Sequence, residues 1–460
     1  MENTPFIPAP SKRHVIGLRC APIPKVRIGL VGLGQRGMRT LERYAFISGA
    51  AITCIADINA DALAEANDRL ARSGRDCART FAGKDGWQEM CRLRDLDLIY
   101  ICTDWASHCE MAVEAMRQGK HAAVEVPAAT TVEECRLLVE TAERTRRHCF
   151  MTENCCYDSF ALATLQMRNA GLLGTITHCE GAYIHDLRDS FGLTAQSKTD
   201  TVRNWMERSC ARHRGNPYPT HGMGPIGQLL RLHREDRLDY LVSLTSHGAG
   251  EDGLQSRVNS TLLRTVGGVS ILLQLDVTTP RPYSRLQTVC GTKGFVSKYP
   301  TPTIQLDGQP LLTGSEALAA MEQHYTSDAA LRWLEGLRLN VPNEMNYAMD
   351  ARLIHCLRYG LPSAQGLRQL LDGPAEHQFF HDGRSGTAVH KGPHPGGFLR
   401  HLRQNCPQSL ARQQVSQRTA ECGQQGPCFF ILLHGPALPA ASIQRLSYHI
   451  HWPPRKYFAL

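Results

Sequence analysis

A glycine-rich turn near the start of the chain constrains its fold more than any other feature. The apolar, β-branched run 26–31 is followed by the residues GLGQRG at positions 32–37, and a helical pattern continues to about residue 48. In such a turn Gly32 permits the sharp bend, Gly34 lets a phosphate approach, and Gly37 lets the helix pack closely on the strand. Because backbone N–H groups at the helix N-terminus would face a pyrophosphate, the pattern predicts a dinucleotide site. A strand–turn–helix without a cofactor is the alternative.

Strand-like and helix-like segments alternate through the first third of the chain. Apolar runs at 51–56 and 98–102 are separated by helix-length segments, at 60–73, 108–119 and 131–145. This alternation predicts a parallel sheet wrapped by helices. Asp57 ends the second run, where its carboxylate would accept hydrogen bonds from ribose hydroxyls and repel a 2′-phosphate. It therefore favours NAD over NADP.

The pattern changes after Asn154. A helix is predicted over 159–170, and a last helix over 343–358. Runs that alternate with a period of two follow the first helix, at 175–184, 238–246, 260–264, 269–277, 287–290 and 294–298. Such alternation indicates a sheet with one buried face, typical of antiparallel sheets. The predicted fold class is α/β, with an N-terminal Rossmann domain and a C-terminal α/β domain that has a mostly antiparallel open sheet.

The expected domain organisation has four parts. Residues 1–24 form an N-terminal extension, 25–153 the NAD-binding domain, and 154–362 the substrate domain. Residues 363–460 are rich in Gln, His, Arg, Gly and Pro without sustained periodicity, so they are expected to be disordered or poorly structured. They also hold ten Lys or Arg against four Asp or Glu, so most of the net charge of +8 belongs to this tail. The rest of the chain carries no nucleic-acid-binding signature.

Composition also limits where the chain can work. No apolar run approaches the roughly 20 residues of a membrane span, and residues 1–24 lack the apolar core of a signal peptide, which predicts a cytoplasmic protein without a membrane partner. The 17 cysteines include no C-x-x-C pair. Reduced, mostly buried thiols are therefore expected, rather than disulfides or a metal site.

Candidate ligand-binding residues follow the predicted strands, since ligands of open α/β sheets lie beyond the carboxyl ends of the strands. The segment 103–108 follows one strand and Glu125-Val126-Pro127 follows another. Asn154 lies at the crossover between the domains, where it could touch the nicotinamide ribose. A solvated loop acid is the alternative for Glu125, and Pro127 predicts a turn or a cis peptide bond.

These segments resemble two related families. The Gfo/Idh/MocA dehydrogenases typically carry Glu-Lys-Pro where this chain has Glu125-Val126-Pro127, and valine cannot transfer a proton. The remaining landmarks resemble glycoside hydrolase family 109, the NAD-dependent α-N-acetylgalactosaminidases. This resemblance runs from about Lys25 to Pro362, and its most specific pieces are ENCCY at 153–157, GAYIHDLR at 181–188, YPTHGMGP at 218–225 and RPY at 281–283.

The resemblance implies a glycosidase that keeps NAD bound through turnover and acts on terminal N-acetylgalactosaminides. In this scheme the C3 hydroxyl of the sugar is oxidised, the acidified C2 hydrogen allows elimination of the aglycone, water adds, and the hydride returns. The implied partners are a small-molecule glycoside and, through the second-domain sheet, a second copy of the chain. An NAD-dependent sugar oxidoreductase and a degenerate NAD-binding protein without turnover are the alternatives.

The resemblance also implies roles for individual residues. The catalytic residues would be His221, in acid/base work, with Tyr183 and Tyr283 at the sugar. The substrate would be bound by Tyr183, Tyr218, Pro219, Thr220, His221 and Tyr283. The cofactor would be bound by Gly32, Gly34, Arg36, Gly37, Asp57, Trp105, Ala106, Ser107, His108, Glu125, Val126, Asn154 and Tyr218. Without the family, His221 could be a helix-entry residue, Tyr183 a core residue, Tyr283 a loop aromatic, and His185 with Asp186 a structural turn pair.

The sequence departs from the family at three places. Residues 105–108 read WASH where the family usually has WEWH, and Met206 stands where an arginine commonly helps to hold the cofactor. Both changes imply weaker NAD retention. From Ser363 onward the chain matches no family feature and has the composition of an out-of-frame translation. Our hypothesis is that this tail results from a frameshift or a misannotated gene.

Overall fold

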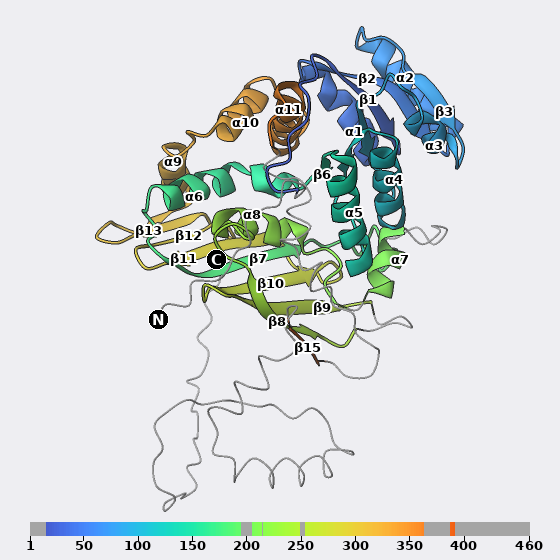
Figure 1. The fold of residues 1–460 in the computed structure, drawn as a ribbon. Coiled ribbons are helices and arrows are strands. Elements are labelled where there is room, and N and C mark those ends of the chain that lie inside the picture. Colours follow the sequence, from blue (N-terminus) through green and yellow to red (C-terminus); the bar gives the residue numbers. More distant parts are fainter. Residues whose placement is uncertain (1–14, 195–204, 214, 249–253, 363–386, 392–460) are drawn as a thin grey trace, which may run out of the picture. The chain divides into compact units, whose positions relative to one another are not determined.

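The computed structural model describes residues 15–194, 205–213, 215–248, 254–362 and 387–391. These residues form two sheets with helices around them (Figure 1). The tail expected from residue 363 onward therefore lies outside the described residues, except for one short strand at 387–391.

The first sheet has six strands among the described residues, in the order β3-β2-β1-β4-β5-β6. Every pairing in it is parallel. This is the strand order of a Rossmann fold, as predicted. The strands are β1 (Val26–Val31), β2 (Ala50–Asp57), β3 (Arg79–Ala82), β4 (Leu98–Ile101), β5 (His121–Val124) and β6 (Cys149–Met151). The helices and turns are α1 (Gln35–Arg43), η1 (Tyr44–Phe46), α2 (Ala60–Arg72), α3 (Gly86–Cys91), α4 (Trp105–Arg117), α5 (Val132–Thr145) and η2 (Asn154–Tyr157).

The second sheet has nine described strands, in the order β14-β13-β12-β11-β7-β10-β9-β8-β15. Only β7 and β10 pair in parallel among them, so the prediction of a mostly antiparallel open sheet is confirmed. Its strands are β7 (Ile176–Ile184), β8 (Leu238–Thr245), β9 (Val258–Thr265), β10 (Ser270–Asp276), β11 (Ser284–Gly291), β12 (Gly294–Ser297), β13 (Thr303–Leu306), β14 (Leu312–Thr313) and β15 (Thr387–Lys391).

Helices cover one face of this second sheet. Helix α8 packs on β7 and β11, and α6 lies beside α8 (Figure 1). Helix α8 also contacts η2, which follows the last strand of the first sheet. The helices of this part are α6 (Ser159–Asn169), α7 (Trp205–Arg212), α8 (Thr220–Leu230), α9 (Gly314–Glu322), α10 (Asp328–Arg338) and α11 (Glu344–Tyr359).

Helix α11 returns to the first domain rather than staying with the second sheet. Its residues Tyr347, Leu353 and Leu357 share one buried cluster with Ile28 and Leu30 of β1. A buried ion pair lies in the same contact, because Nη2 of Arg43 lies 2.6 Å from Oδ2 of Asp350. The side chains of this pair are 1% and 0% exposed, and the hydroxyl of Tyr100 also donates to Asp350 over 3.1 Å.

Replacing Asp350 with asparagine is expected to destabilise the protein by about 3–5 kcal/mol, because it leaves the guanidinium of Arg43 buried without a counter-charge. The free energy of unfolding in urea would measure this. Asp95→Asn is a matched control, since Asp95 pairs with Arg79 at a site where both side chains are about half exposed. That pair should contribute about 0–1 kcal/mol. Equal effects of the two substitutions would contradict the prediction.

Two further expectations concern the whole described part of the chain. Its 14 cysteines are all free and 11 of them are buried, so the expectation of buried thiols is confirmed for these residues. No helix in the described ranges is long and apolar enough to cross a membrane.

Candidate active site

The glycine turn has the geometry that each of its glycines was predicted to supply. Gly32 has φ +85°, in the left-handed region. A Cβ on Gly37 would lie 1.9 Å from the carbonyl oxygen of Gly32, whereas a Cβ on Gly34 would meet nothing within 4 Å. Helix α1 then begins at Gln35 without a side-chain cap. Uncapped N–H groups beside open space fit a pyrophosphate, so the turn fits a dinucleotide such as NAD.

Asp57 lies beside this turn at the end of β2. Its Oδ2 accepts a hydrogen bond from the backbone N–H of Leu33 over 2.5 Å, and Oδ1 accepts one from Asn59 over 2.8 Å. The side chain is only partly buried, so lone pairs stay available for ribose hydroxyls. The sequence suggested only the ribose contact, but the carboxylate also fixes the glycine turn.

The segment after β4 is held by hydrogen bonds to its own backbone. The N-terminus of α4 is capped by Asp104, which accepts from the N–H of Ser107 over 3.1 Å. His108 is buried between two carbonyl oxygens, with Nδ1 2.8 Å from Pro127 and Nε2 3.1 Å from Thr103. It therefore ties this turn to the Glu125–Pro127 segment, whose Val126–Pro127 peptide bond is cis. Ala106 is exposed on the same turn.

Glu125 faces the glycine turn. It is 8% exposed, so the alternative of a solvated loop acid is wrong. Its Oε2 lies 3.6 Å from Nε of Arg36, and Glu125 raises the pKa of that guanidinium. The pair links two of the predicted cofactor segments, which are far apart in the sequence.

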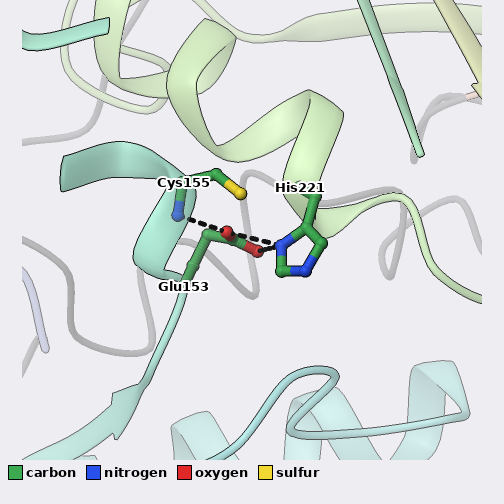
Figure 2. A group of neighbouring side chains, drawn as sticks. All are labelled: Glu153, Cys155 and His221. Carbon is green, nitrogen blue, oxygen red and sulfur yellow. Dashed lines mark hydrogen bonds and ion pairs between the residues drawn. The ribbon is translucent and has the colours of Figure 1, made fainter. Parts of the chain in front are cut away.

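A buried ion pair forms the centre of the second part of the site (Figure 2). His221 lies in the first turn of α8, and Glu153 follows β6. Nδ1 of His221 lies 2.8 and 3.0 Å from Oε1 and Oε2 of Glu153, and Oε1 also accepts from the N–H of Cys155. The carboxylate is 0% exposed and the imidazole 9%. Glu153 was not among the predicted site residues, although its place after a strand of the first sheet was the available signal.

This pair carries opposite charges. Burial alone would lower the pKa of His221, but Cys155 and Glu153 raise it to about 10. Burial would likewise raise the pKa of Glu153, and the imidazolium outweighs this and lowers it. The donor atoms of the three residues lie within 4.8 Å of one another, a spacing that a metal ion could also use. The ion pair between Glu153 and His221 explains their close contact without a metal ion.

Aromatic rings connect this pair to the predicted cofactor segments. Trp105, the first residue of α4, stacks on Tyr218 with ring centroids 5.2 Å apart and planes 12° apart. The hydroxyl of Tyr218 lies 3.1 Å from Nε2 of His221. Tyr183 packs on both, with centroids 4.9 Å from Tyr218 and 5.3 Å from His221. The structure therefore brings four of the predicted site residues together: Trp105, Tyr183, Tyr218 and His221.

Two further rings, those of His185 and Tyr283, extend this aromatic cluster to the surface. The Tyr183 hydroxyl lies 2.9 Å from Nδ1 of His185, whose ring is 5.3 Å from that of Tyr283. Tyr283 is 46% exposed and forms the outer end of the cluster. Asp186, which was considered as a turn partner of His185, pairs with Arg188.

Two glycines allow this approach of α8 to the sheet. A Cβ on Gly222 would lie 2.6 Å from the backbone nitrogen of Ala182, and a Cβ on Gly181 would lie 2.6 Å from the carbonyl oxygen of Gly222. Pro219 occupies the N-cap position of α8, and Thr220 is the first residue of the helix, directly before His221. Asn154 is 8% exposed and is the first residue of η2, which contacts α8.

The departures from the family also have a place in the structure. Trp205, at the start of α7, meets Trp105 edge-on with ring centroids 5.5 Å apart. Met206 is partly buried and packs against a buried apolar cluster that contains residues of both domains. An apolar contact therefore stands where an arginine was expected from the family pattern.

The comparisons with known proteins agree with this geometry. Residues 26–153 match the family described as oxidoreductase family, NAD-binding Rossmann fold, and residues 157–258 and 254–364 match glycosyl hydrolase 109, C-terminal domain. A protein of Bacteroides fragilis named alpha-N-acetylgalactosaminidase is 50% identical over 373 residues, which are 77% of this chain and 87% of that protein. The chain belongs to glycosyl hydrolase family 109.

Other relatives place this family 109 member in a wider fold group. A glycosyl hydrolase family 109 protein of Phocaeicola vulgatus is also 50% identical, over 76% of this chain and 90% of that protein. Among solved structures, the WlbA dehydrogenase of Bordetella pertussis and the aldose-aldose oxidoreductase of Caulobacter crescentus both have a TM-score of 0.56. They are 17% and 16% identical, cover 77% and 76% of this chain and 93% and 94% of their own chains, and show the shared fold. The protein is thus a glycoside hydrolase with an NAD-binding Rossmann domain, as the resemblance implied.

Proposed function

We propose that this family 109 enzyme hydrolyses terminal α-N-acetylgalactosaminides and retains NAD through turnover. The main support is the buried Glu153–His221 pair. Nε2 of His221 lies next to the hydroxyl of Tyr218, and the ring of Tyr218 stacks on Trp105 of the predicted cofactor loop. Glycosidases commonly use two carboxylic acids, one of them free to protonate the leaving group, and NAD-dependent enzymes are exceptions. Here Glu153 is engaged by His221 through both oxygens. The name of the Bacteroides fragilis relative supports the choice of sugar.

In this proposal His221 is the general acid. With its pKa raised, the imidazole stays protonated at neutral pH, and Glu153 holds the Nδ1 side. The Nε2–H is then the proton available to the oxygen of the departing aglycone. Tyr218, whose hydroxyl lies 3.1 Å from Nε2, positions that proton.

Tyr183 and Tyr283 bind the sugar in this proposal. Burial raises the pKa of Tyr183 to about 12, so its hydroxyl remains protonated. Burial lowers the pKa of His185, whose neutral Nδ1 accepts a hydrogen bond from the hydroxyl of Tyr183. The phenolic lone pairs are then left for the sugar. Bound NAD supplies hydride acceptance and return at C3, which acidifies the C2 hydrogen.

A net sugar oxidoreductase is the less favoured alternative. Val126 is 5% exposed and occupies the place where dehydrogenases of this superfamily carry a lysine. Without that lysine, the alcohol lacks the expected proton acceptor. The chain therefore departs from the usual dehydrogenase pattern at this position, but the C3 oxidation of the proposed cycle needs a proton acceptor too, so net NADH formation is the measurement that distinguishes the two functions.

The proposal extends to assembly through the second-domain sheet. Leu244 and Leu262, on the neighbouring strands β8 and β9, are 52% and 56% exposed. Exposed apolar side chains of this kind support pairing of two copies through this sheet.

Hydrolysis of 4-nitrophenyl α-N-acetylgalactosaminide tests the function. Purified protein, with and without added NAD, is expected to release nitrophenol without net formation of NADH, because the hydride returns within each turnover. Nitrophenol and NADH absorbance would be followed together. Stoichiometric NADH would instead identify a dehydrogenase, and silence in both channels from folded, NAD-loaded protein would reject the proposed substrate and leave the degenerate alternative.

A further inference from the structure

Three side chains with metal-binding atoms converge at the start of α8. Glu153 follows β6, Cys155 lies in η2, and His221 lies in the first turn of α8. A carboxylate oxygen of Glu153, Sγ of Cys155 and a ring nitrogen of His221 all lie within 4.8 Å of one another. Figure 2 shows the three side chains pointing toward one another. The proposed function uses Glu153 and His221 and leaves the thiol of Cys155 without a chemical role.

No sequence pattern predicts this group. Glu153 and Cys155 are close in the chain, but His221 is 68 residues beyond Glu153 and meets them because α8 contacts η2. Metal sites are recognised in sequences by cysteines and histidines at short spacings, and the chain has no C-x-x-C pair. The sequence-based expectation of no metal site therefore does not extend to ligands that the fold brings together.

The donor set fits a thiophilic divalent cation. Zinc binds carboxylate oxygen, imidazole nitrogen and thiolate sulfur, whereas magnesium and calcium prefer oxygen ligands. With bonds of about 2.0–2.3 Å, a tetrahedral zinc ion keeps its ligand atoms about 3.3–3.6 Å apart. Nδ1 of His221 lies 2.8 and 3.0 Å from the oxygens of Glu153, and the whole group lies within 4.8 Å. Side-chain movements on the order of 1 Å therefore complete a zinc coordination shell.

Neighbouring groups already orient two of these ligands. Oε1 of Glu153 accepts from the N–H of Cys155 over 2.9 Å, which fixes the carboxylate and leaves Oε2 for a metal ion. Nε2 of His221 lies 3.1 Å from the Tyr218 hydroxyl, so Nδ1 is the ring nitrogen that faces Glu153. Metal sites commonly fix a histidine ligand through a hydrogen bond to its other ring nitrogen. The carboxylate and the imidazole therefore have the supporting contacts that metal ligands require.

Burial and charge also suit a dication. Glu153 and Cys155 are 0% and 3% exposed, and the side chain of His221 is 9% exposed. Bound as carboxylate, thiolate and neutral imidazole, the three ligands carry two negative charges, which balance those of Zn²⁺. Their attraction to the ion is strong because little water screens it. A substrate that receives a proton from His221 must reach this ring, and an ion can use the same route.

We propose that Glu153, Cys155 and His221 bind a zinc ion that inhibits the enzyme. Coordination replaces the proton on Nδ1 of His221 and the proton of the thiol, and both protons leave to solvent. Because Nδ1 is then bonded to zinc, the ring is no longer the imidazolium that protonates the departing aglycone. The metal site stands on the geometry alone, whereas the inhibition rests on the proposed function.

Cobalt substitution tests the metal site without measuring activity. Co²⁺ can replace Zn²⁺, and a thiolate ligand gives it a sulfur-to-cobalt charge-transfer band. The full chain, after treatment with EDTA, should show this band on titration with Co²⁺, and Zn²⁺ should abolish it. Cys155→Ser should lose the band and bind Zn²⁺ more than about 100-fold more weakly, since even loss of a group that supports a metal ligand costs about 10- to 100-fold. Cys156→Ser is the matched control and should keep both properties, because buried Cys156 is next in the chain but outside the group.

Hydrolysis of 4-nitrophenyl α-N-acetylgalactosaminide tests the inhibition in the NAD-loaded enzyme. Zn²⁺ at a concentration that saturates the site should abolish the activity of the wild type and of Cys156→Ser, and EDTA should restore it. Mg²⁺ should have no effect, because it prefers oxygen ligands. The activity of Cys155→Ser, relative to its own value without metal, should be insensitive to the same concentration of Zn²⁺.

The two measurements separate the metal site from the function. Equal zinc affinity of Cys155→Ser and the wild type, or a cobalt complex without the charge-transfer band, would overturn the site. If Cys155→Ser fails to fold, Glu153→Gln removes a different ligand and should also weaken zinc binding. Full activity of the zinc-saturated wild type would overturn the inhibition while the site stands. A wild type that cleaves no substrate would reject the proposed function and the inhibition with it, and the cobalt titration would still decide the site.

Discussion

Valine at position 34 is expected to abolish NAD binding, and hydrolysis with it, while the protein stays folded. Gly34 has φ −65°, which valine adopts without strain. A Cβ there meets nothing within 4 Å, so the fold accepts the side chain. The branched side chain fills the space in front of the uncapped N–H groups of α1, where the pyrophosphate would lie. The loss in affinity should exceed about 100-fold.

The neighbouring glycine supplies the contrast. In Gly37→Ala the new Cβ would lie 1.9 Å from the carbonyl oxygen of Gly32, so helix and strand must separate. That variant should lose thermal stability together with NAD binding. Calorimetric titration with NAD and thermal melts of both variants distinguish the two effects. Normal NAD affinity in Gly34→Val would show that the phosphates do not approach this turn.

Local chemistry explains why much of the fold could be predicted. Some features are determined by residues close together in the sequence, and these appear at nearly the expected positions. They are the glycine turn, Asp57 at the end of β2 and the long alternating strands of the second sheet. Short elements were missed because three or four residues carry no measurable period, as in β3 and β6. Helix α10 was missed for another reason. Leu331 and Leu337 are both about half exposed, so its apolar residues do not mark one buried face.

The site could be predicted less completely, because its chemistry depends on distant contacts. Glu153 and His221 are 68 residues apart, and only the seating of α8 on β7 shows that they form an ion pair. Ser107 and His108 were predicted to contact the cofactor, and that remains a prediction. Their hydrogen bonds within the described residues fix the turn that presents Trp105.

Replacing Glu153 with glutamine is expected to lower the alkaline limit of activity by more than two pH units. In the wild type, burial opposes the imidazolium, but Cys155 and Glu153 raise the pKa of His221 to about 10, so the acid form persists through neutral pH. Glutamine keeps the shape of the side chain but removes the carboxylate that both hydrogen bonds to Nδ1 use. Burial then opposes only the contribution of Cys155, so the pKa of His221 should fall toward the ordinary histidine value of about 6.5.

The profile of kcat/KM against pH measures this shift, since it reports the free enzyme. At pH 8 the variant should retain about one thirtieth of wild-type activity, and it should recover as the pH falls toward 6. His221→Ala is the reference for complete loss of the acid and should be inactive at every pH while it still binds NAD.

A merely structural role for Glu153 makes a different prediction, because the ion pair also contributes to stability. The lowered pKa of Glu153 gives stability that is complete above its ordinary value of 4.5 and is lost as the pH falls through the lowered pKa. The raised pKa of His221 gives stability that is complete below 6.5 and is lost as the pH rises toward 10. The melting temperatures of wild type and Glu153→Gln should therefore differ most between pH 4.5 and 6.5. If that difference appears while the alkaline limb of activity stays in place, Glu153 supports the fold and His221 is not the acid.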